Sequence, residues 1–472
     1  RGRAASSPSK LDGGPRAGCD AMRDNKNWRT RVGPEGLVAL RLVALLLSAV
    51  RGAVVDFEVD AGAVPDDDSN ATVWKNGAAM NATLAALRPG DTLLLPNKTF
   101  YLMGGIQARG LDSVTLRFDG TVVFSDDIDG WPRSGSGIGA PALMCMYFAD
   151  VKNLTITSSH IGLINGRGEK WWGIPGIGYL MRTENRPRLL EIHGGTDILV
   201  ENVFLKNSPY WSFWAHGVDG LEIRNSHVDA RRDRYDGHHI LDLSAFNTDG
   251  FDVAGRNIWI HDSSVWSQDD TFCVKDDSEN ILIERVNASG IGLTIGSIAS
   301  NVRNVTFRDA YMHHSGKGIY VKFRGNGRIE DVTYENIVMD APERWAIWIG
   351  PAQQSDSRDI CAAHPCSLCW PLFKPWAKCN APDQASFINV TLRNITIRNP
   401  KMSPGVILAS ASSPMQNITF DNVVVENAPN KPFDGYFCEG VQSGLATGTT
   451  SPVPSCFKDW TESRRADDEL SI

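Results

Sequence analysis

The chain has 472 residues, more than one ordinary globular core of about 100–200 residues, which leaves two or three domains or one elongated repeat. Hydrophobic residues make up 42% and charged residues 22%, a balance that excludes wholesale disorder. The 55 acidic and 47 basic residues give a net charge of −8, and no stretch after residue 51 concentrates Lys and Arg, which argues against a nucleic-acid partner.

The first 53 residues are interpreted as an N-terminal extension that directs the chain to a compartment. Basic residues precede an apolar run at 37–50, which spans only about 21 Å as a helix, less than the ~30 Å of a hydrocarbon core. Small residues follow it, as in a secretory signal peptide. An uncleaved signal anchor is the alternative. We expect a folded domain at 54–458 and a C-terminal tail at 459–472.

The cysteines also favour the secretory route. Six of the nine lie in loop-like sequence, at 361, 366, 369, 379, 438 and 456, and predict about three disulfides in an oxidising compartment, with the pairing open. A zinc site at Cys366, Cys369 and His364 is the alternative, but no second CxxC lies at ribbon spacing. Cys145 and Cys273 lie in apolar segments and are expected to be buried, unreactive thiols.

The body of the chain repeats a short segment in which apolar and polar residues alternate after an Asn or Asp. Alternation predicts a half-buried strand, and Asn or Asp suits a sharp corner. The steps between segments are mostly 23–28 residues; we interpret a step of 44 as two turns of 22, and steps of 37 and 58 as loop insertions, the second carrying the Cys-rich stretch near 355–385. The first apolar residues of the segments lie at 154, 198, 221, 258, 281, 305, 332, 390 and 418.

Such repeats predict an all-β fold, a single right-handed parallel β-helix (a solenoid) of about ten coils with loop insertions. One strand cannot bury its apolar face alone, whereas coils stacked at about 4.8 Å share a continuous core. A leucine-rich solenoid has a different consensus, and a propeller needs repeats of about 40 residues.

Three carboxylates recur at the spacing of one coil. Asp249 precedes Asp270 by 21 residues, and Asp269 adjoins it, so stacking places Asp249 about 4.8 Å from the Asp269/Asp270 pair if a turn directs both outward. Carboxylates this close repel one another and raise at least one pKa. Inverting glycoside hydrolysis needs one protonated acid and one carboxylate base that activates water. The structural alternative is that all three are corner residues.

The run from Asn247 to Arg324 resembles glycoside hydrolase family 28, the polygalacturonases, whose motifs are NTDG, a DD pair, GHG and RIK. The chain has NTDG at 247–250, DD at 269–270 and, upstream, GLINGRG at 162–168 and NSPYW at 207–211; the resemblance covers about 54–440. It implies that Asp269 is the general acid, that Asp249 and Asp270 hold the attacking water, and that Lys322 contacts a sugar carboxylate.

Two departures from the family pattern affect specificity. Ile291 stands where the family has the His of GHG, and Tyr320 stands where it has the Arg of RIK, so a bidentate clamp for a carboxylate is missing. The Cys that usually follows DD is displaced to Cys273. These changes favour a neutral or mixed backbone, such as rhamnogalacturonan or another cell-wall polymer.

Further candidates surround these motifs. Asn247, Gln268, Tyr320 and Trp211 are expected to bind substrate beside Lys322. His238, His239, His313 and His314 are candidate acid–base groups or ordinary loop residues, and Lys317, Arg324 and Arg328 form a basic wall or ordinary surface charge. Seven tryptophans either stack on sugar rings or pack in the core: Trp171, Trp172, Trp211, Trp214, Trp266, Trp345 and Trp348.

Three functions are weighed. The first is a secreted, monomeric hydrolase that cleaves a pectin-like polysaccharide by inversion, with no cofactor, no metal, no nucleic acid and no obligate membrane partner. The second is a catalytically inactive β-helix that binds glycans or serves the wall structure. The third is a lyase on the same scaffold, which needs calcium and an Arg or Lys base.

Overall fold

The computed structural model describes residues 52–459 except 138, 174–184, 232–244, 353–365, 367–369 and 371–378. The extension and the tail expected at the two ends lie outside the described residues, apart from residues 52, 53 and 459. Among the described helices, none combines the length and the apolar character that crossing a bilayer requires.

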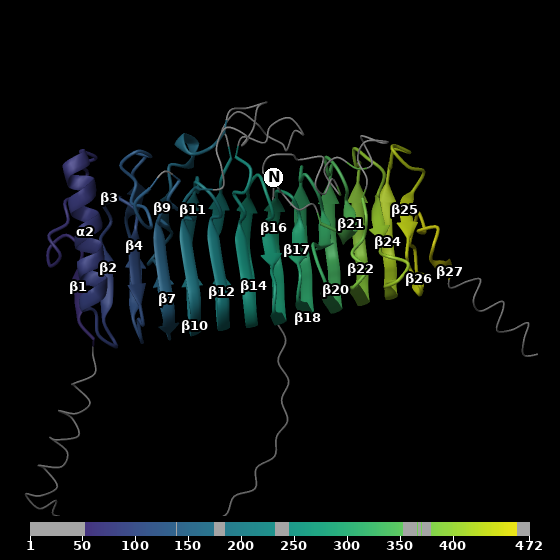
Figure 1. The fold of residues 1–472 in the computed structure, drawn as a ribbon, viewed down its shortest axis with the longest axis horizontal. Helices are drawn as coiled ribbons and strands as arrows, with labels where there is room; N and C mark the ends of the chain where they lie inside the picture. The colour runs from purple at the N-terminus through teal and green to yellow at the C-terminus, as the bar shows by residue number, and fades with distance from the viewer. Residues whose placement is uncertain are drawn as a thin grey trace, which may run out of the picture. The chain divides into compact units, whose positions relative to one another are not determined.

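The described chain begins with a short strand and a helix, followed by a long series of strands (Figure 1). Ser69 caps the helix α2 (Asn70–Ala86), since its hydroxyl accepts a hydrogen bond from the Thr72 amide. The helix packs against β3 and β4 at the N-terminal end of the stack. The first strands are β1 (Val54–Asp56), β2 (Thr92–Leu95), β3 (Thr99–Leu102), β4 (Ile106–Arg109), β5 (Thr115–Phe118), β6 (Thr121–Phe124), β7 (Met146–Lys152), β8 (Thr155–Thr157) and β9 (Gly162–Asn165), followed by a 3-10 turn η1 (Gly168–Lys170).

The remaining strands continue the stack to the yellow end of Figure 1. Every pairing between these named strands is parallel, which agrees with the predicted parallel β-helix. They are β10 (Leu190–Glu201), β11 (Val203–Lys206), β12 (Phe213–Arg224), β13 (His227–Asp229), β14 (Phe251–Trp266), β15 (Phe272–Val274), β16 (Ser278–Ser289), β17 (Leu293–Ile298), β18 (Asn301–His313), β19 (Ile319–Phe323), β20 (Gly327–Asp340), β21 (Ile347–Pro351), β22 (Ala385–Arg398), β23 (Gly405–Leu408), β24 (Gln416–Glu426), β25 (Tyr436–Glu439), β26 (Gly444–Thr447) and β27 (Lys458–Asp459).

The register confirms the repeat, with one correction. The first apolar residues of successive segments pair directly, as Ile198, Leu221, Ile258, Ile281, Val305, Val332, Val390 and Ile418. The interpretation of the 44-residue step as two turns was wrong, because Leu199 pairs with Thr155 and the step is therefore one coil. The extra residues lie between the end of β9 and the start of β10, since β9 itself pairs with β11 and so has a counterpart in the next coil.

Asn and Asp form the corners that the sequence predicted. Asn389 and Asn417 have φ of 55°, in the left-handed region that few other residues adopt at low cost. Their side chains also form a ladder between coils: Asn417 Nδ2 donates to Asn389 Oδ1 at 3.0 Å, and Asn389 Nδ2 donates to Asp331 Oδ1 at 2.8 Å. Asn389 and Asn417 each begin an Asn-x-Thr sequence, the acceptor pattern for N-glycosylation, and here their amides stabilise the stacking of the coils.

Alternation separates an inner core from an outer face. Phe213, Phe251 and Phe272 are fully buried and lie in register on β12, β14 and β15, with ring centroids 5.7 and 5.8 Å apart. Their immediate neighbours point outward, so Trp214 and Asp252 lie on the outer face of this sheet. The stacked apolar side chains of the core thus fix the register of the strands, and this register also aligns the residues on the outer face.

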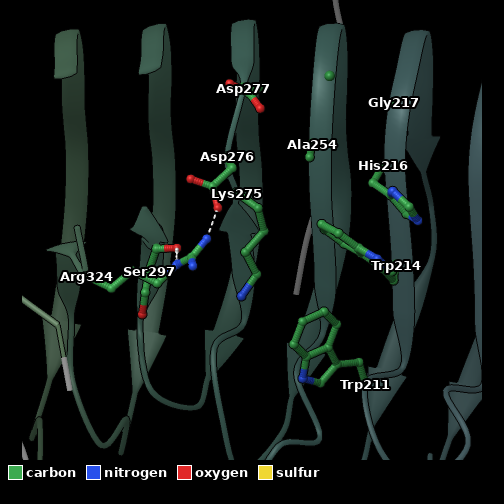
Figure 2. Close-up of a pocket in the computed structure, with 11 residues that line it drawn as sticks. Trp211, Trp214, His216, Gly217, Ala254, Lys275, Asp276, Asp277, Ser297 and Arg324 are labelled. Atoms are coloured by element: carbon green, nitrogen blue, oxygen red, sulfur yellow. Dashed lines mark hydrogen bonds and ion pairs between the residues drawn. The ribbon is translucent and has the colours of Figure 1, made fainter. Parts of the chain in front are cut away.

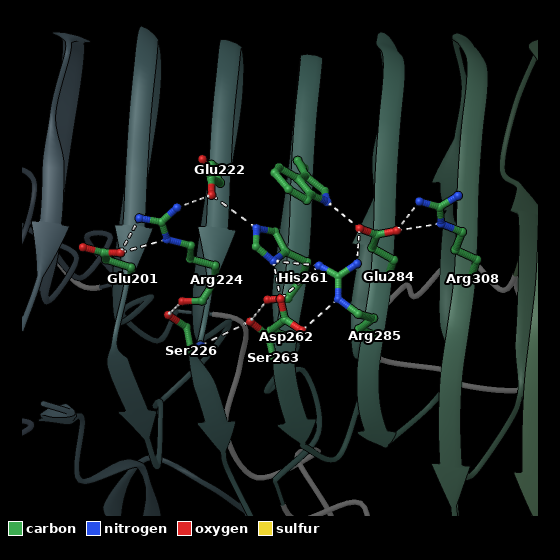
Figure 3. A network of polar contacts seen from close by, with 11 residues as sticks. Glu201, Glu222, Arg224, Ser226, His261, Asp262, Ser263, Glu284, Arg285 and Arg308 are labelled. Carbon is green, nitrogen blue, oxygen red and sulfur yellow. Dashed lines mark hydrogen bonds and ion pairs between the residues drawn. The ribbon is translucent and has the colours of Figure 1, made fainter. Parts of the chain in front are cut away.

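A second face carries charged residues that join neighbouring coils (Figure 3). Arg224 forms ion pairs with Glu201 at 2.7 Å and with Glu222 at 2.8 Å, and His261 Nε2 lies 3.2 Å from Glu222. Arg285 of the next coil contacts Asp262 at 2.9 Å. Exposed pairs contribute up to about 1 kcal/mol each, so this network supports register more than total stability.

The cysteines divide as the sequence analysis expected. Cys366 bonds Cys379 and Cys438 bonds Cys456, so Cys366 is a disulfide partner rather than a zinc ligand. Cys145 and Cys273 are free and buried. Cys361, Cys369 and His364 lie outside the described residues.

Candidate active site

Three carboxylates meet at the turn that leads into β15. Phe251 pairs with Phe272, so Asp249 lies beside Asp270 on the neighbouring coil, as the spacing of 21 residues predicted. The turn before β15 directs Asp269 to the same place. One oxygen from each of the three groups lies within 4.8 Å of the others. The convergence inferred from the spacing is confirmed.

Asp269 is fixed by backbone and side-chain donors. The Asn247 amide and its Nδ2 donate to Oδ2 at 3.0 and 3.3 Å, and the Asp270 amide donates to Oδ1 at 2.9 Å. Asn247 adopts φ of 59°, which turns both of its donors toward this carboxyl group. Burial raises the pKa of Asp269 well above its usual value, and the charges of Asp249 and Asp270 raise it further. This carboxyl group is suited to carry a proton.

Asp270 has the opposite electrostatic environment. Burial by itself raises the pKa of Asp270, but the ammonium groups of Lys322 and Lys275 outweigh it, and the net pKa lies below the usual value. Lys322 Nζ lies 2.9 Å from Oδ2, and the Thr294 hydroxyl donates to Oδ1 at 3.0 Å. Adjacent carboxyl groups thus have pKa values shifted in opposite directions, the arrangement that an acid–base pair requires.

Asp249 shares the raised pKa of Asp269. Burial is the main cause and the Asp252 charge adds to it, while Lys275 opposes both. Asp249 Oδ2 lies 3.6 Å from Lys275 Nζ, and its Oδ1 accepts no hydrogen bond from the described residues. That oxygen can accept a hydrogen bond from a bound water or sugar hydroxyl.

Two charged residues of the site were not singled out from the sequence. Lys275 Nζ lies 3.1 Å from Asp252 Oδ2 and 3.8 Å from Asp270 Oδ2, and so links the carboxylates of two coils. Asp252 is fully buried, and burial raises its pKa to about 6. The sequence did contain a signal for Asp252. It occupies an outward-facing position of its strand and pairs with Cys273 on the next coil, close to the catalytic carboxylates.

The three catalytic candidates are also the described group whose oxygens are close enough to hold a metal ion. Two ammonium groups already contact their oxygens, Lys322 on Asp270 and Lys275 on Asp249 and Asp270. A dication placed among them would be repelled by both lysines. The donor set does not fit a resident calcium ion.

The candidate substrate residues have unequal access to solvent. Trp211 lines a groove and is partly exposed, Lys322 is 8% exposed, and Asn247 is partly buried. Gln268 is buried, and its Oε1 accepts a hydrogen bond from the Ala245 amide at 2.9 Å, which stabilises the turn. Tyr320 is 3% exposed, with Lys317 Nζ 4.0 Å and Lys322 Nζ 4.1 Å from its ring centroid. It positions the Lys322 ammonium group.

A groove of about 550 Å³ adjoins the carboxylates (Figure 2). Trp211, Trp214 and His216 line one part of it, and Arg324, but neither Lys317 nor Arg328, adds positive charge. Lys275 joins the groove to the carboxylates, since its ammonium group lies 4.8 Å from the Trp211 ring centroid and contacts Asp249, Asp252 and Asp270. Flat rings and a few charged donors are typical of a sugar-binding surface.

The remaining aromatic and histidine candidates lie elsewhere. Trp171, Trp172, Trp345 and Trp348 are buried by packing, as their structural interpretation expected: Trp171 in the main core, and Trp345 and Trp348 in a separate apolar cluster. Trp266 is partly exposed, its ring centroid lies 5.1 Å from that of His313, and both line a pocket separate from the groove. His238 and His239 lie outside the described residues. His314 contacts His313 with ring centroids 6.1 Å apart.

Comparison with known proteins places these features in one family. Residues 91–354 match the model of glycosyl hydrolases family 28. The chain is similar to a probable endopolygalacturonase A of Aspergillus kawachii, with 29% identity over 247 residues, which are 50% of this chain and 60% of that protein. It is also similar to a probable rhamnogalacturonase B of Aspergillus niger, with 27% identity over 285 residues, 57% of this chain and 45% of that protein. The match thus spans about 60% or less of these relatives.

Solved structures agree on the architecture. An endo-xylogalacturonan hydrolase from Aspergillus tubingensis superposes with a TM-score of 0.57 at 19% sequence identity, over 86% of this chain and 99% of that one. At this identity the likeness is one of fold.

Proposed function

The chain belongs to glycosyl hydrolases family 28, and we propose on this premise that it hydrolyses a glycosidic bond of a pectin-type polysaccharide. The observation that carries the proposal is the opposite pKa shift of two adjacent carboxyl groups, Asp269 raised and Asp270 lowered. A glycosidase needs a protonated acid beside an ionised base at one working pH.

In this mechanism Asp269 donates its proton to the glycosidic oxygen as the bond from that oxygen to the anomeric carbon breaks. A water molecule, held by Asp270 and the unpaired Asp249 Oδ1, forms the new bond to the anomeric carbon. Its proton passes to Asp270, whose carboxylate Lys322 keeps ionised. Proton exchange with solvent then restores both groups, so protons and charge balance over the cycle.

Inversion is the proposed outcome, and retention is the alternative that closely spaced carboxyl groups allow. The nearest oxygens of the three groups lie within 4.8 Å of one another, and the separation between carboxyl groups is typically about 6.5–9.5 Å in inverting pairs and about 5–5.5 Å in retaining pairs. Retention would need an ionised carboxylate as the nucleophile, and Asp270 is the one whose pKa is lowered. Proton NMR of the first product decides: an anomer opposite to that of the cleaved bond supports inversion, and the same anomer supports retention.

The substrate is proposed to be a pectin-type backbone of mixed or low charge. Tyr320 is buried, and Ile291 packs against the cluster that contains it, so neither supplies the charged donor found in the family motif. Lys322 and Arg324 remain as cations near or in the groove. Polygalacturonan and rhamnogalacturonan are the polymers to compare.

Secretion is proposed with the activity. Two disulfides lie in the described chain, Cys366–Cys379 and Cys438–Cys456, and such bonds persist in oxidising compartments. The polymer partner is extracellular as well. Sequencing the N-terminus of the protein recovered from culture medium tests both secretion and removal of the extension.

The test is release of reducing ends from a panel of de-esterified pectin, rhamnogalacturonan and neutral glucans, in the presence of EDTA. We expect release by the wild type and a fall of about 10²–10⁴-fold in Asp269→Asn. Asp197→Asn is the matched control, because Asp197 is an exposed corner residue at φ 56°, a conformation that Asn adopts readily.

Three other results would contradict parts of the proposal. Equal activity of Asp269→Asn and the wild type would show that Asp269 is not the general acid. Activity that EDTA abolishes and calcium restores would indicate the lyase. Binding to a polymer without release of ends, by a folded wild type, would indicate the inactive glycan-binding protein.

A further inference from the structure

The outer face of one sheet runs past the catalytic carboxylates in both directions. Its strands are β7, β10, β12, β14, β15, β17, β19, β21, β23 and β25, which pair in that order. The register of these strands aligns one outward-facing residue from each strand, and we call this set of residues the outer column. It comprises Tyr147, Glu191, Trp214, Asp252, Cys273, Thr294, Tyr320, Trp348, Val406 and Phe437.

On the N-terminal side of the carboxylates this face is open and carries flat rings. Tyr147, Trp214 and His216 are partly exposed and His193 is exposed. The rings form a continuous series: Tyr147 and His193 share a hydrogen bond of 3.0 Å, His193 and His216 have centroids 4.0 Å apart, and Trp214 stacks on His216 at 5.0 Å. We call these four residues the ring track. Figure 2 shows Trp214 and His216 of the ring track in the groove that Lys275 also lines.

On the C-terminal side the same face is covered. Trp348 and Val406 of the outer column are fully buried although they point away from the core. Trp370 lies over them, with ring centroids 6.3 Å from Trp348 and 5.1 Å from Phe437, and Phe433 lies 5.0 Å from Phe437. We call Trp345, Trp348, Trp370, Phe433 and Phe437 the aromatic cap. The disulfide Cys366–Cys379 closes a loop that contains Trp370, and both cysteines contact the same apolar cluster.

The cap begins close to the catalytic carboxylates. Asp270 lies at the start of β15, and Tyr320, which belongs to the same apolar cluster as the cap, lies two strands further, on β19. Two strand spacings are about 10 Å, the length of one or two linked pyranose rings. A longer polymer lying along the sheet would have to pass through Trp348 and Trp370.

We propose that the groove accepts a polysaccharide on one side of the scissile bond and only a chain end on the other, so that the protein cleaves close to a chain end. The long part of the polymer lies on the ring track, whose flat apolar faces suit the C–H faces of pyranose rings. The aromatic cap limits the other part to one or two sugars. This inference rests on the proposed hydrolase activity and adds its mode of action.

The first test is the size of the early products on whichever polymer of the panel the full-length wild type cleaves. The expected result is mono- and disaccharides at low conversion, with reducing ends accumulating while solution viscosity stays nearly constant. Long oligosaccharides with a rapid loss of viscosity would overturn the inference and leave the hydrolase proposal intact. No release from any polymer would overturn the hydrolase proposal, and this inference with it.

The second test opens the cap. Trp370→Ala, and separately Phe433→Ala, should shift the products toward longer oligosaccharides and make viscosity fall earlier. Phe57→Ala is the control, because Phe57 is fully buried against Phe100 near the N-terminal end of the stack and its loss also lowers stability. Its product sizes should match those of the wild type. Unchanged short products in both folded cap variants, confirmed by circular dichroism, would overturn the role of the cap.

Discussion

The ammonium group of Lys322 lies 2.9 Å from Oδ2 and 3.2 Å from Oδ1 of Asp270, although 52 residues separate them. The pair connects the turn before β15 with β19 across two coils. Both side chains are almost fully buried, so their attraction is screened little by water. Lys322 thereby keeps Asp270 ionised beside an acid whose pKa is raised.

Replacing Lys322 should therefore move the acidic limb of the pH–activity profile to higher pH. In Lys322→Met the burial of Asp270 is opposed only by Lys275 and the Thr294 hydrogen bond, so the pKa of Asp270 rises and its base form is lost at a higher pH than in the wild type. At any pH below that limb, the rate falls about ten-fold for each pH unit by which the limb has moved upward. The check is kcat/KM as a function of pH.

Lys322→Arg is the matched variant for this prediction. It keeps the charge, so its acidic limb should stay near the wild-type position while kcat falls because the guanidinium geometry differs. A limb that stays in place in Lys322→Met would contradict the role of Lys322 in the ionisation of Asp270.

Asp252 predicts how stability depends on pH. Its pKa is raised by burial to about 6, from an ordinary value of 3.8. A raised pKa in the folded state means that its contribution is fully present below about pH 4 and is lost as pH rises through about 6, a change of roughly 3 kcal/mol. Asp252→Asn should reduce this decline, measured as Tm between pH 4 and 7 against Asp197→Asn. If the Tm of Asp252→Asn falls between pH 4 and 7 as much as that of the wild type, groups other than Asp252 cause the decline.

Replacing Trp214 should change substrate binding rather than the chemical step. Trp214 is partly exposed in the groove, where its ring contacts those of Trp211 and His216. Removing the ring in Trp214→Ala should raise KM about three- to ten-fold, for a stacking contribution of about 0.5–1.5 kcal/mol, with kcat nearly unchanged. Trp74→Ala is the control, since Trp74 is 45% exposed on α2. An equal fall in kcat with KM unchanged would place Trp214 in the chemical step instead.

The asparagine ladder predicts a pair of stability effects. Asn389→Ala loses two hydrogen bonds to neighbouring coils and places a Cβ-bearing residue without a polar side chain at φ 55°. We expect a loss of about 3–4 kcal/mol in the free energy of unfolding, combining about 1 kcal/mol for each of the two bonds with about 1–2 kcal/mol for the backbone. Asn389→Gly avoids the backbone cost and should lose less, as denaturant unfolding can measure. Equal losses in both variants would assign the whole effect to the ladder.

Much of this architecture could be predicted because a solenoid repeats in sequence what it repeats in space. Alternation and Asn corners predicted the paired residues from Ile198 to Ile418 correctly. Only the 44-residue step was misread, because its length is a multiple of a coil even though its residues form one coil with a longer loop. Length alone cannot distinguish two coils from one coil with an insertion.

The sequence by itself determined the coil, the corners and the convergence of Asp249 with Asp270, since a spacing of 21 residues equals one coil. The tertiary structure decided the rest, because burial and distant charges act through space. Lys275 and Asp252 contact the catalytic carboxylates across neighbouring coils. The pKa order arises because two ammonium groups contact Asp270, whereas burial and neighbouring carboxylates dominate at Asp269. Trp370, which comes from a loop, packs over Trp348 on the outer face of the sheet. Alternation alone predicts that this outer face is exposed.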